Sequence, residues 1–110
     1  MVSTTRDRPH TLDSKADLDD IVAEHDRVLV EFHTEGCAIC ASMEPILSTV
    51  AKATDVPVVT MNPRDDPVLV EEYDVRSVPK LLLFEDGVVT KTKEDGFVPV
   101  EELLAFVGED

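Results

Sequence analysis

The sequence predicts a three-layer α/β sandwich, in which helices cover both faces of a central mixed sheet of four to five strands. In the first half of the chain, segments with helical spacing of apolar residues alternate with short β-branched runs. This alternation is typical of parallel strands joined by helical crossovers. In the second half, Asp86-Gly87 lies between two strand-like runs and predicts a hairpin, which adds an antiparallel strand to the sheet.

Short apolar runs rich in β-branched residues, together with the two arms of the hairpin, are the expected strands. In chain order they are residues 10–12, 28–33, 56–61, 80–85 and 88–93. Pro57 fits only the start of its strand, where no hydrogen bond of the ladder is lost. Glu31 interrupts the second strand, and a buried carboxylate is costly unless it is neutral, paired or used in chemistry.

Helices are expected between these strands and after the last one, over residues 15–25, 37–53, 67–73 and 99–107. Asp13 or Ser14 is suited to cap the first helix, because such side chains accept hydrogen bonds from the free N–H groups of a first turn. Asp65 or Asp66 is the expected cap of the third helix for the same reason. Pro45 lies inside the second helix, where it removes one backbone hydrogen bond and should kink the helix.

The chain has the size of one domain. It contains 110 residues, 43% of them hydrophobic, which is enough for one core. We expect residues 1–10 to form a flexible N-terminal arm and residues 11–110 a single domain. The first ten residues lack the apolar centre of a signal peptide, and no apolar run approaches the length that spans a bilayer. We therefore expect a cytoplasmic protein with no membrane partner.

The charge balance is strongly acidic, with 24 Asp and Glu against 10 Lys and Arg and a formal net charge of −14. Such a surface repels polyanions, so nucleic acid is excluded as a partner. The acidic residues are dispersed through the chain and do not form one terminal block. Dispersed acid on an ordinary core resembles the proteins of extreme halophiles, in which salt screens the self-repulsion. An ordinary acidic protein remains the alternative.

The chain has two cysteines, Cys37 and Cys40, and they form a C-x-x-C motif between a buried strand and the start of a helix. This setting is typical of a reactive thiol pair or a metal site. In a reducing compartment, a lone pair is more often catalytic or metal-binding than structural. Zinc requires about four ligands, and beyond His33 the sequence offers no further ligand cluster, so we expect no metal.

Four separated features resemble the thioredoxin family, and the likeness extends from about Leu12 to Val107. They are Val30-Glu31-Phe32 shortly before C-x-x-C, Pro45 five residues after Cys40, the run Val75-Arg76-Ser77-Val78-Pro79 before a strand and Asp-Gly, and Gly96 before the last helix. C-x-x-C alone is weak evidence, whereas all four features in this order are specific.

The resemblance implies a thioredoxin fold and a thiol–disulfide oxidoreductase that reduces protein disulfides, with no cofactor beyond the Cys37–Cys40 pair. Cys37 would be the nucleophile, because a helix N-terminus favours the thiolate, and Cys40 would resolve the mixed disulfide. Glu31 would lie beneath the pair and accept the Cys40 proton. The implied partners are disulfide-containing proteins and an upstream disulfide reductase, and we expect a monomer.

The resemblance also implies a substrate groove beside Cys37. The Val78–Pro79 bond would be cis, and the backbone of Val78 would pair with an extended substrate chain. Gly36 and Gly96 would form the other walls of the groove. Lys80, directly after Pro79, would lower the pKa of Cys37 or bind an acidic partner, and the alternative is a solvated strand start.

The sequence departs from the family pattern around the cysteines. Gly36 replaces the usual Trp, Ala38-Ile39 replace Gly-Pro, and Thr60 stands where a Lys is usual. Because the Trp is part of the usual substrate platform, its loss leaves a second function open. In that alternative the chain is a redox-inactive binding or scaffold module of thioredoxin fold, including one that bridges a metal.

Ile39 has a backbone N–H that a Pro at this position lacks, and this N–H is placed to donate to the Cys37 sulfur. A stabler thiolate makes the disulfide more oxidising, so we expect a reduction potential above the value of about −270 mV for thioredoxin. Equilibration of the dithiol with a glutathione buffer measures this potential. A value at or below about −270 mV contradicts the expectation.

Overall fold

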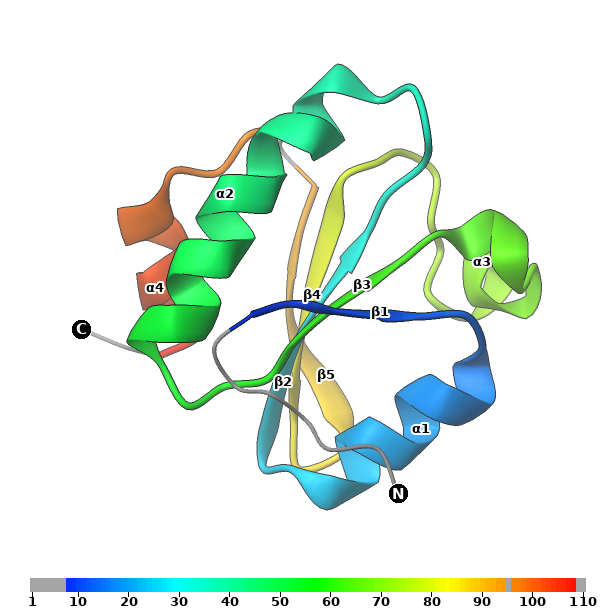
Figure 1. The fold of residues 1–110 in the computed structure, drawn as a ribbon. Coiled ribbons are helices and arrows are strands. Elements are labelled where there is room, and N and C mark those ends of the chain that lie inside the picture. The colour runs from blue at the N-terminus through cyan, green and yellow to red at the C-terminus, as the bar shows by residue number, and fades with distance from the viewer. Residues whose placement is uncertain (1–7, 95, 109–110) are drawn as a thin grey trace.

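The structure is a computed structural model that describes residues 8–94 and 96–108. Its strands are β1 (His10–Leu12), β2 (Arg27–Phe32), β3 (Val58–Met61), β4 (Lys80–Glu85) and β5 (Val88–Lys93). Its helices are α1 (Lys15–Glu24), α2 (Ala38–Ala53), the 3-10 helix η1 (Pro63–Asp65), α3 (Val68–Glu72) and α4 (Val100–Phe106). The strands form one sheet in the order β1-β3-β2-β4-β5 (Figure 1).

The sheet is mixed, as the sequence predicts. β1 and β2 both run parallel to β3, whereas β4 is antiparallel to β2 and to β5. The turn between β4 and β5 places Asp86 and Gly87 at φ values of 52° and 86°, which is the positive-φ pair of a tight hairpin. The predicted α/β class with a central mixed sheet is therefore confirmed.

Two hydrophobic layers cover the two faces of the sheet (Figure 1). α1 and α3 pack on one face, and α2 and α4 on the other. Side chains along β2 alternate between the layers, so that Val30 and Phe32 point to α1 and α3 whereas Leu29 points to α2. This alternation places Glu31 on the α2 face, the same face as Leu29.

The ends of the four α-helices agree with the predicted ones to within one residue, but one of the two predicted caps differs. Ser14 caps α1 as expected, because its Oγ accepts a hydrogen bond from the N–H of Asp17 at 3.2 Å. α3 begins after Pro67 and has no side-chain cap, so the predicted cap by Asp65 or Asp66 is wrong. The Asp66 carboxylate instead accepts the N–H of Lys15, the first residue of α1, at 2.9 Å.

Other predicted boundaries shift for local reasons. β3 begins at Val58, one residue after Pro57, because a Pro cannot donate to the ladder. Pro45 lies within the single helix α2 and does not divide it. Of the arm predicted over residues 1–10, residues 1–7 lie outside the described part of the chain. Its last residue, His10, pairs with Val59 in the sheet.

Within residues 8–94 and 96–108, no helix is both long and apolar enough to cross a bilayer.

The bond between Asp66 and α1 predicts a measurable contribution to stability. Replacing Asp66 by Ala should lower the free energy of unfolding by about 1 kcal/mol, because an N–H of the first turn loses its acceptor. Urea denaturation measures the change. Asp65→Ala is the matched control, because Asp65 is an exposed neighbour, and an equal loss in both variants would contradict the assignment.

Candidate active site

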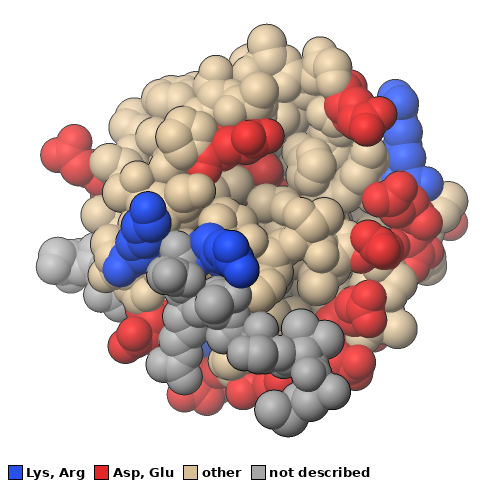
Figure 2. All heavy atoms as spheres, viewed as in Figure 1, with Lys and Arg blue, Asp and Glu red and all other residues tan. Residues whose placement is uncertain are grey.

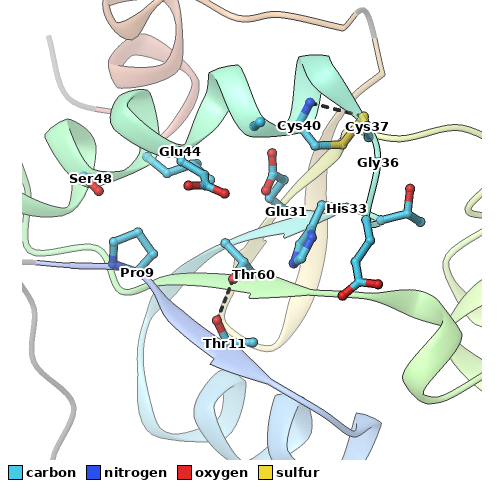
Figure 3. A pocket seen from close by; sticks show the side chains of 14 residues that line it. Pro9, Thr11, Glu31, His33, Gly36, Cys37, Cys40, Glu44, Ser48 and Thr60 are labelled. Atoms are coloured by element: carbon cyan, nitrogen blue, oxygen red, sulfur yellow. Dashed lines mark hydrogen bonds between the residues drawn. A yellow bond between two sulfur atoms is a disulfide. The ribbon is translucent and has the colours of Figure 1, made fainter.

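Cys37 and Cys40 form a disulfide at the N-terminus of α2, with their Cα atoms 5.2 Å apart. Cys37 is the N-cap residue, and its Sγ accepts a hydrogen bond from the N–H of Cys40 at 3.2 Å (Figure 3). The two sulfurs differ in exposure, since Cys37 is half-buried and Cys40 is 5% exposed. One cysteine of the pair is thus accessible to a partner, and the other faces the protein interior.

The turn before the disulfide depends on Gly36, whose φ of +80° lies in the left-handed region that favours glycine. The chain therefore leaves β2, turns through residues 34–36 and enters α2 with Cys37 at the helix N-terminus. The expected donor to the Cys37 sulfur was the N–H of Ile39. The structure places the N–H of Cys40 there instead, while the Ile39 side chain is exposed.

Glu31 lies beneath the disulfide, on the α2 face of β2 (Figure 3). Its side chain is 2% exposed, and its Oε2 has no hydrogen-bond partner among the described residues. Burial, together with the nearby negative charge of Glu44, raises the pKa of Glu31 from 4.5 to about 8. Glu31 is therefore largely protonated at neutral pH.

Thr60 follows Glu31 in a row across the sheet, because the parallel register pairs Glu31 with Thr60 and Thr60 with Thr11. The hydroxyls of the two threonines lie 3.2 Å apart and form a hydrogen bond (Figure 3). The position at which the family usually has a Lys is thus filled by a neutral side chain. That side chain offers Glu31 no positive charge.

A cavity of about 500 Å³ opens beside the disulfide and reaches Glu31. Its walls come from β1, β2, β3, α2 and the turn before α2 (Figure 3). The lining residues that carry polar side chains or sulfur are Thr11, Glu31, His33, Thr34, Glu35, Cys37, Cys40, Glu44, Ser48 and Thr60. A buried carboxylate and a buried cysteine sulfur therefore share one hollow that is open to solvent.

The Val78–Pro79 peptide bond is cis, the geometry that the resemblance implies. The last residue of β2, Phe32, pairs with the first residue of β4, Lys80, so Val78-Pro79 enters the sheet at the edge where β2 leaves it. Of the four residues predicted to bind substrate, Gly36 lines the cavity, and Val78, Pro79 and Gly96 lie outside its lining. Three of the four predicted groove residues thus lie outside the cavity, and Gly36 is common to the cavity and the predicted groove.

Lys80 does not occupy the position that the sequence analysis considered for it. It is 4% exposed, and its Nζ donates to the carbonyl oxygens of Tyr73 and Asp74 at 2.8 and 2.9 Å. The Glu94 carboxylate lies 3.7 Å from the same Nζ. Lys80 is therefore neither a solvated strand start nor a lining residue of the cavity.

Glu44 is the residue of the site that the sequence analysis missed. It lies on α2 four residues after Cys40, so both side chains project from the same face of the helix. Glu44 lines the cavity opposite Glu31 and contributes to the raised pKa of Glu31. The i, i+4 spacing from Cys40 was the available signal, but an exposed Glu on a helix is too common to single out.

Metal binding finds no support in the surroundings of the disulfide. Within residues 8–94 and 96–108, no group of three or more His, Cys, Asp or Glu side chains is arranged to hold a metal ion.

The pair of sulfurs is joined in a disulfide, which is the oxidised half of a dithiol cycle. The fold and this site together define a thiol–disulfide oxidoreductase.

Comparison with known proteins identifies the family. The family model described as Thioredoxin matches residues 10–109, so the chain belongs to the thioredoxin family. The thioredoxin of Mycoplasmoides gallisepticum is 32% identical over 91 residues, which cover 82% of this chain and 90% of that protein. The thioredoxin of Haemophilus influenzae is 32% identical over 97 residues, which cover 86% of this chain and 90% of that protein.

Solved structures agree with this assignment. A mutant thioredoxin from Halobacterium salinarum NRC-1 superposes with a TM-score of 0.88 at 29% identity, over 96% of this chain and 93% of that one. Mitochondrial thioredoxin 3 of Saccharomyces cerevisiae, in its oxidised form, shares the fold with a TM-score of 0.80 at 22% identity, over 89% of this chain and 92% of that one.

The activity follows from the family and the cysteine pair. The chain is a protein-disulfide oxidoreductase, and it reduces disulfide-containing proteins with the Cys37–Cys40 pair as its redox centre. The redox-inactive binding module that the sequence left open is therefore not the function that these findings support.

The raised pKa of Glu31 predicts how stability depends on pH. Below about pH 4.5 the folded and unfolded states both carry protonated Glu31. Between pH 4.5 and about 8 the unfolded state ionises while the folded state stays protonated, so stability falls as the pH rises. Above about pH 8 the loss is complete and constant.

Glu31→Gln removes this titration, so the variant should become more stable than the native protein as the pH rises from 4.5 to 8. The difference in the free energy of unfolding should reach the order of a few kcal/mol. Urea denaturation of both oxidised proteins across this pH range measures it. A difference that does not change with pH would contradict a buried, protonated Glu31.

Proposed function

We propose that Cys37 attacks the target disulfide, that Cys40 resolves the mixed disulfide, and that Glu31 accepts the Cys40 proton. The observation that carries this proposal is the shared cavity, which the buried Glu31 carboxylate and the buried Cys40 both line. The difference in exposure supports the order of attack, because Cys37 is the more accessible sulfur. A thiolate at Cys37 also receives the Cys40 N–H and the free amides of the first turn of α2.

The two steps balance in electrons and protons. The Cys37 thiolate attacks one sulfur of the target disulfide, and the bonding pair leaves with the other sulfur, which takes a proton from water. The Cys40 thiol then gives its proton to the ionised form of Glu31, which is the minor form at neutral pH, while its sulfur attacks Cys37. The second target sulfur leaves as a thiolate, and the Cys37–Cys40 disulfide of the present structure is the product.

Glu31 is matched to this transfer in proton affinity. A free thiol has a pKa of about 8.5. A general base works best when its own pKa lies close to the pH at which the protein operates. An exposed carboxylate, with a pKa of about 4.3, would take little of the thiol proton. The pKa of about 8 brings Glu31 into the range of the group that it deprotonates.

The substrate chain is proposed to bind beside the disulfide, against Gly36, Val78, Pro79 and Gly96. Pro79 follows a cis bond at the edge of the sheet from which Cys37 also emerges, which supports this placement. The backbone of Val78 would pair with an extended target segment, as in strand addition. Gly96 has a φ of +90°, and the chain just after it is held to α2 by a hydrogen bond from the Val98 N–H to Met43 Sδ at 3.4 Å.

The cellular setting is proposed from composition. We infer a cytoplasmic monomer that an upstream disulfide reductase returns to the dithiol, and that contributes to cell redox homeostasis. Figure 2 shows acidic side chains scattered over the visible face with few basic ones among them. Together with the net charge of −14, this surface disfavours nucleic acid and anionic membranes as partners and fits a protein adapted to high salt.

Insulin reduction with dithiothreitol as donor tests the assignments. Cys37→Ser should abolish turnover, and Cys40→Ser should accumulate mixed disulfides because nothing resolves them. Glu31→Gln should slow the resolving step by about 10²-fold or more, because positioned acid–base groups contribute at least that much. Stopped-flow measurement of target release from the mixed disulfide at Cys37 gives the rate of this step.

Ser48→Ala is the matched control, because Ser48 lines the same cavity but carries no titrating group at neutral pH. It should leave the resolving step unchanged. A Glu31→Gln variant that resolves as fast as the native protein would remove Glu31 from the mechanism, while leaving the two cysteines in place.

A further inference from the structure

The cavity contains a second carboxylate that the dithiol cycle as described does not use. Glu44 is an exposed residue of α2, and its side chain reaches into the cavity from the side opposite β2. Figure 3 shows the carboxylates of Glu44 and Glu31 in the space between α2 and the sheet, with Cys40 one helical turn from Glu44. Two acids therefore flank the path between Cys40 and solvent.

The described lining of the cavity around Glu31 contains no Lys or Arg that compensates this second charge. α2 contributes Glu44, and the turn before α2 contributes His33 and Glu35. β3 and β1 contribute hydroxyls, those of Thr60 and Thr11, which bond to each other.

The lysines of the two remaining strands are engaged elsewhere. On β4, Lys80 is held by the carbonyl oxygens of Tyr73 and Asp74. On β5, the Nζ of Lys93 lies 2.6 Å from the Glu102 carboxylate, and the Nζ of Lys91 donates to the carbonyl oxygen of Phe106 at 3.0 Å. The negative charge of Glu44 therefore acts on Glu31 across a hollow without a described counter-charge in its lining.

We propose that Glu44 is a positioning residue for the resolving step: its charge, acting across the cavity, sets the pH at which Glu31 can take the Cys40 proton. This inference rests on the proposed role of Glu31 as the proton acceptor. Glu44 does not touch the sulfurs and changes no bond. It acts by favouring the protonated form of a second carboxylate, as one acid of a coupled pair does to the other.

The pairing of Glu31 with Glu44 raises the proton affinity of Glu31 above the value that burial alone would give. A buried carboxylate without a neighbouring acid would release its proton at a lower pH and be a weaker acceptor for a thiol proton. Glu44 is exposed and lines the cavity, and its negative charge adds to the effect of burial on Glu31.

A charge series at position 44 tests the proposal. Glu44→Gln removes the negative charge, and Glu44→Lys reverses it, at an exposed site where neither change disturbs the core. The titration of the Glu31 carboxyl carbon, followed by NMR in the oxidised protein, should shift to lower pH in Glu44→Gln and further in Glu44→Lys. The midpoint at which the resolving rate rises with pH should shift in the same order.

Glu35→Gln is the matched control. Glu35 is also exposed and lines the same cavity, but it is not among the causes of the raised pKa of Glu31. The control should leave the Glu31 titration where it is. An equal shift in the control would assign the effect to net charge and overturn the specific role of Glu44. An unchanged Glu31 titration in both position-44 variants would also overturn that role.

The two proposals fail in different ways. If Glu31→Gln resolves mixed disulfides at the native rate, Glu31 is not the acceptor and both proposals fall. If Glu31→Gln is slow but the position-44 variants keep the native pH profile, Glu31 remains the acceptor and the role of Glu44 alone is overturned. Thermal unfolding of each variant verifies that the measured shifts come from folded protein.

Discussion

β2 is hydrogen-bonded along both edges, to β3 and to β4, and the site depends on this double pairing. The pairing fixes which face each β2 side chain points to, and so places Glu31 under α2 and not under α1. It also fixes where the chain leaves the sheet after Phe32, close to where β4 begins. A shift of one residue in this register would turn Glu31 to the opposite layer and separate it from Cys40.

The raised pKa of Glu31 reflects a cavity whose described lining has no Lys or Arg. Thr60 stands beside Glu31 in the sheet and carries no charge. Lys80, the lysine of β4, donates to the backbone carbonyl oxygens of Tyr73 and Asp74. Desolvation and a second acid then both act in the same direction on Glu31. The disulfide chemistry is common to the family, and the raised pKa of the carboxyl beneath the disulfide comes from its burial and from Glu44.

The sequence predicted those parts of the structure that depend on local pattern. Apolar periodicity located the strands, the Asp86-Gly87 pair located the hairpin, and the family motifs located the cysteines and Glu31. The errors concern contacts between residues far apart in the chain. Asp66 looked like a cap for the adjacent helix, but its partner is the N–H of Lys15, 51 positions away. The engagement of Lys80 and the approach of Glu44 to Glu31 likewise exist only once helices and strands have packed.

The hydrogen bond between the Val98 N–H and Met43 Sδ has a consequence for chemical durability. A protein that handles oxidants is at risk of losing its own methionines to sulfoxide, which turns an apolar side chain polar and disrupts a core. Met43 lies three residues from Cys40, yet it is 0% exposed, as is Met61, and its sulfur already accepts an N–H. In the dithiol form the accessible Cys37 is therefore more open to a peroxide than either thioether, and its oxidation to the disulfide is reversible.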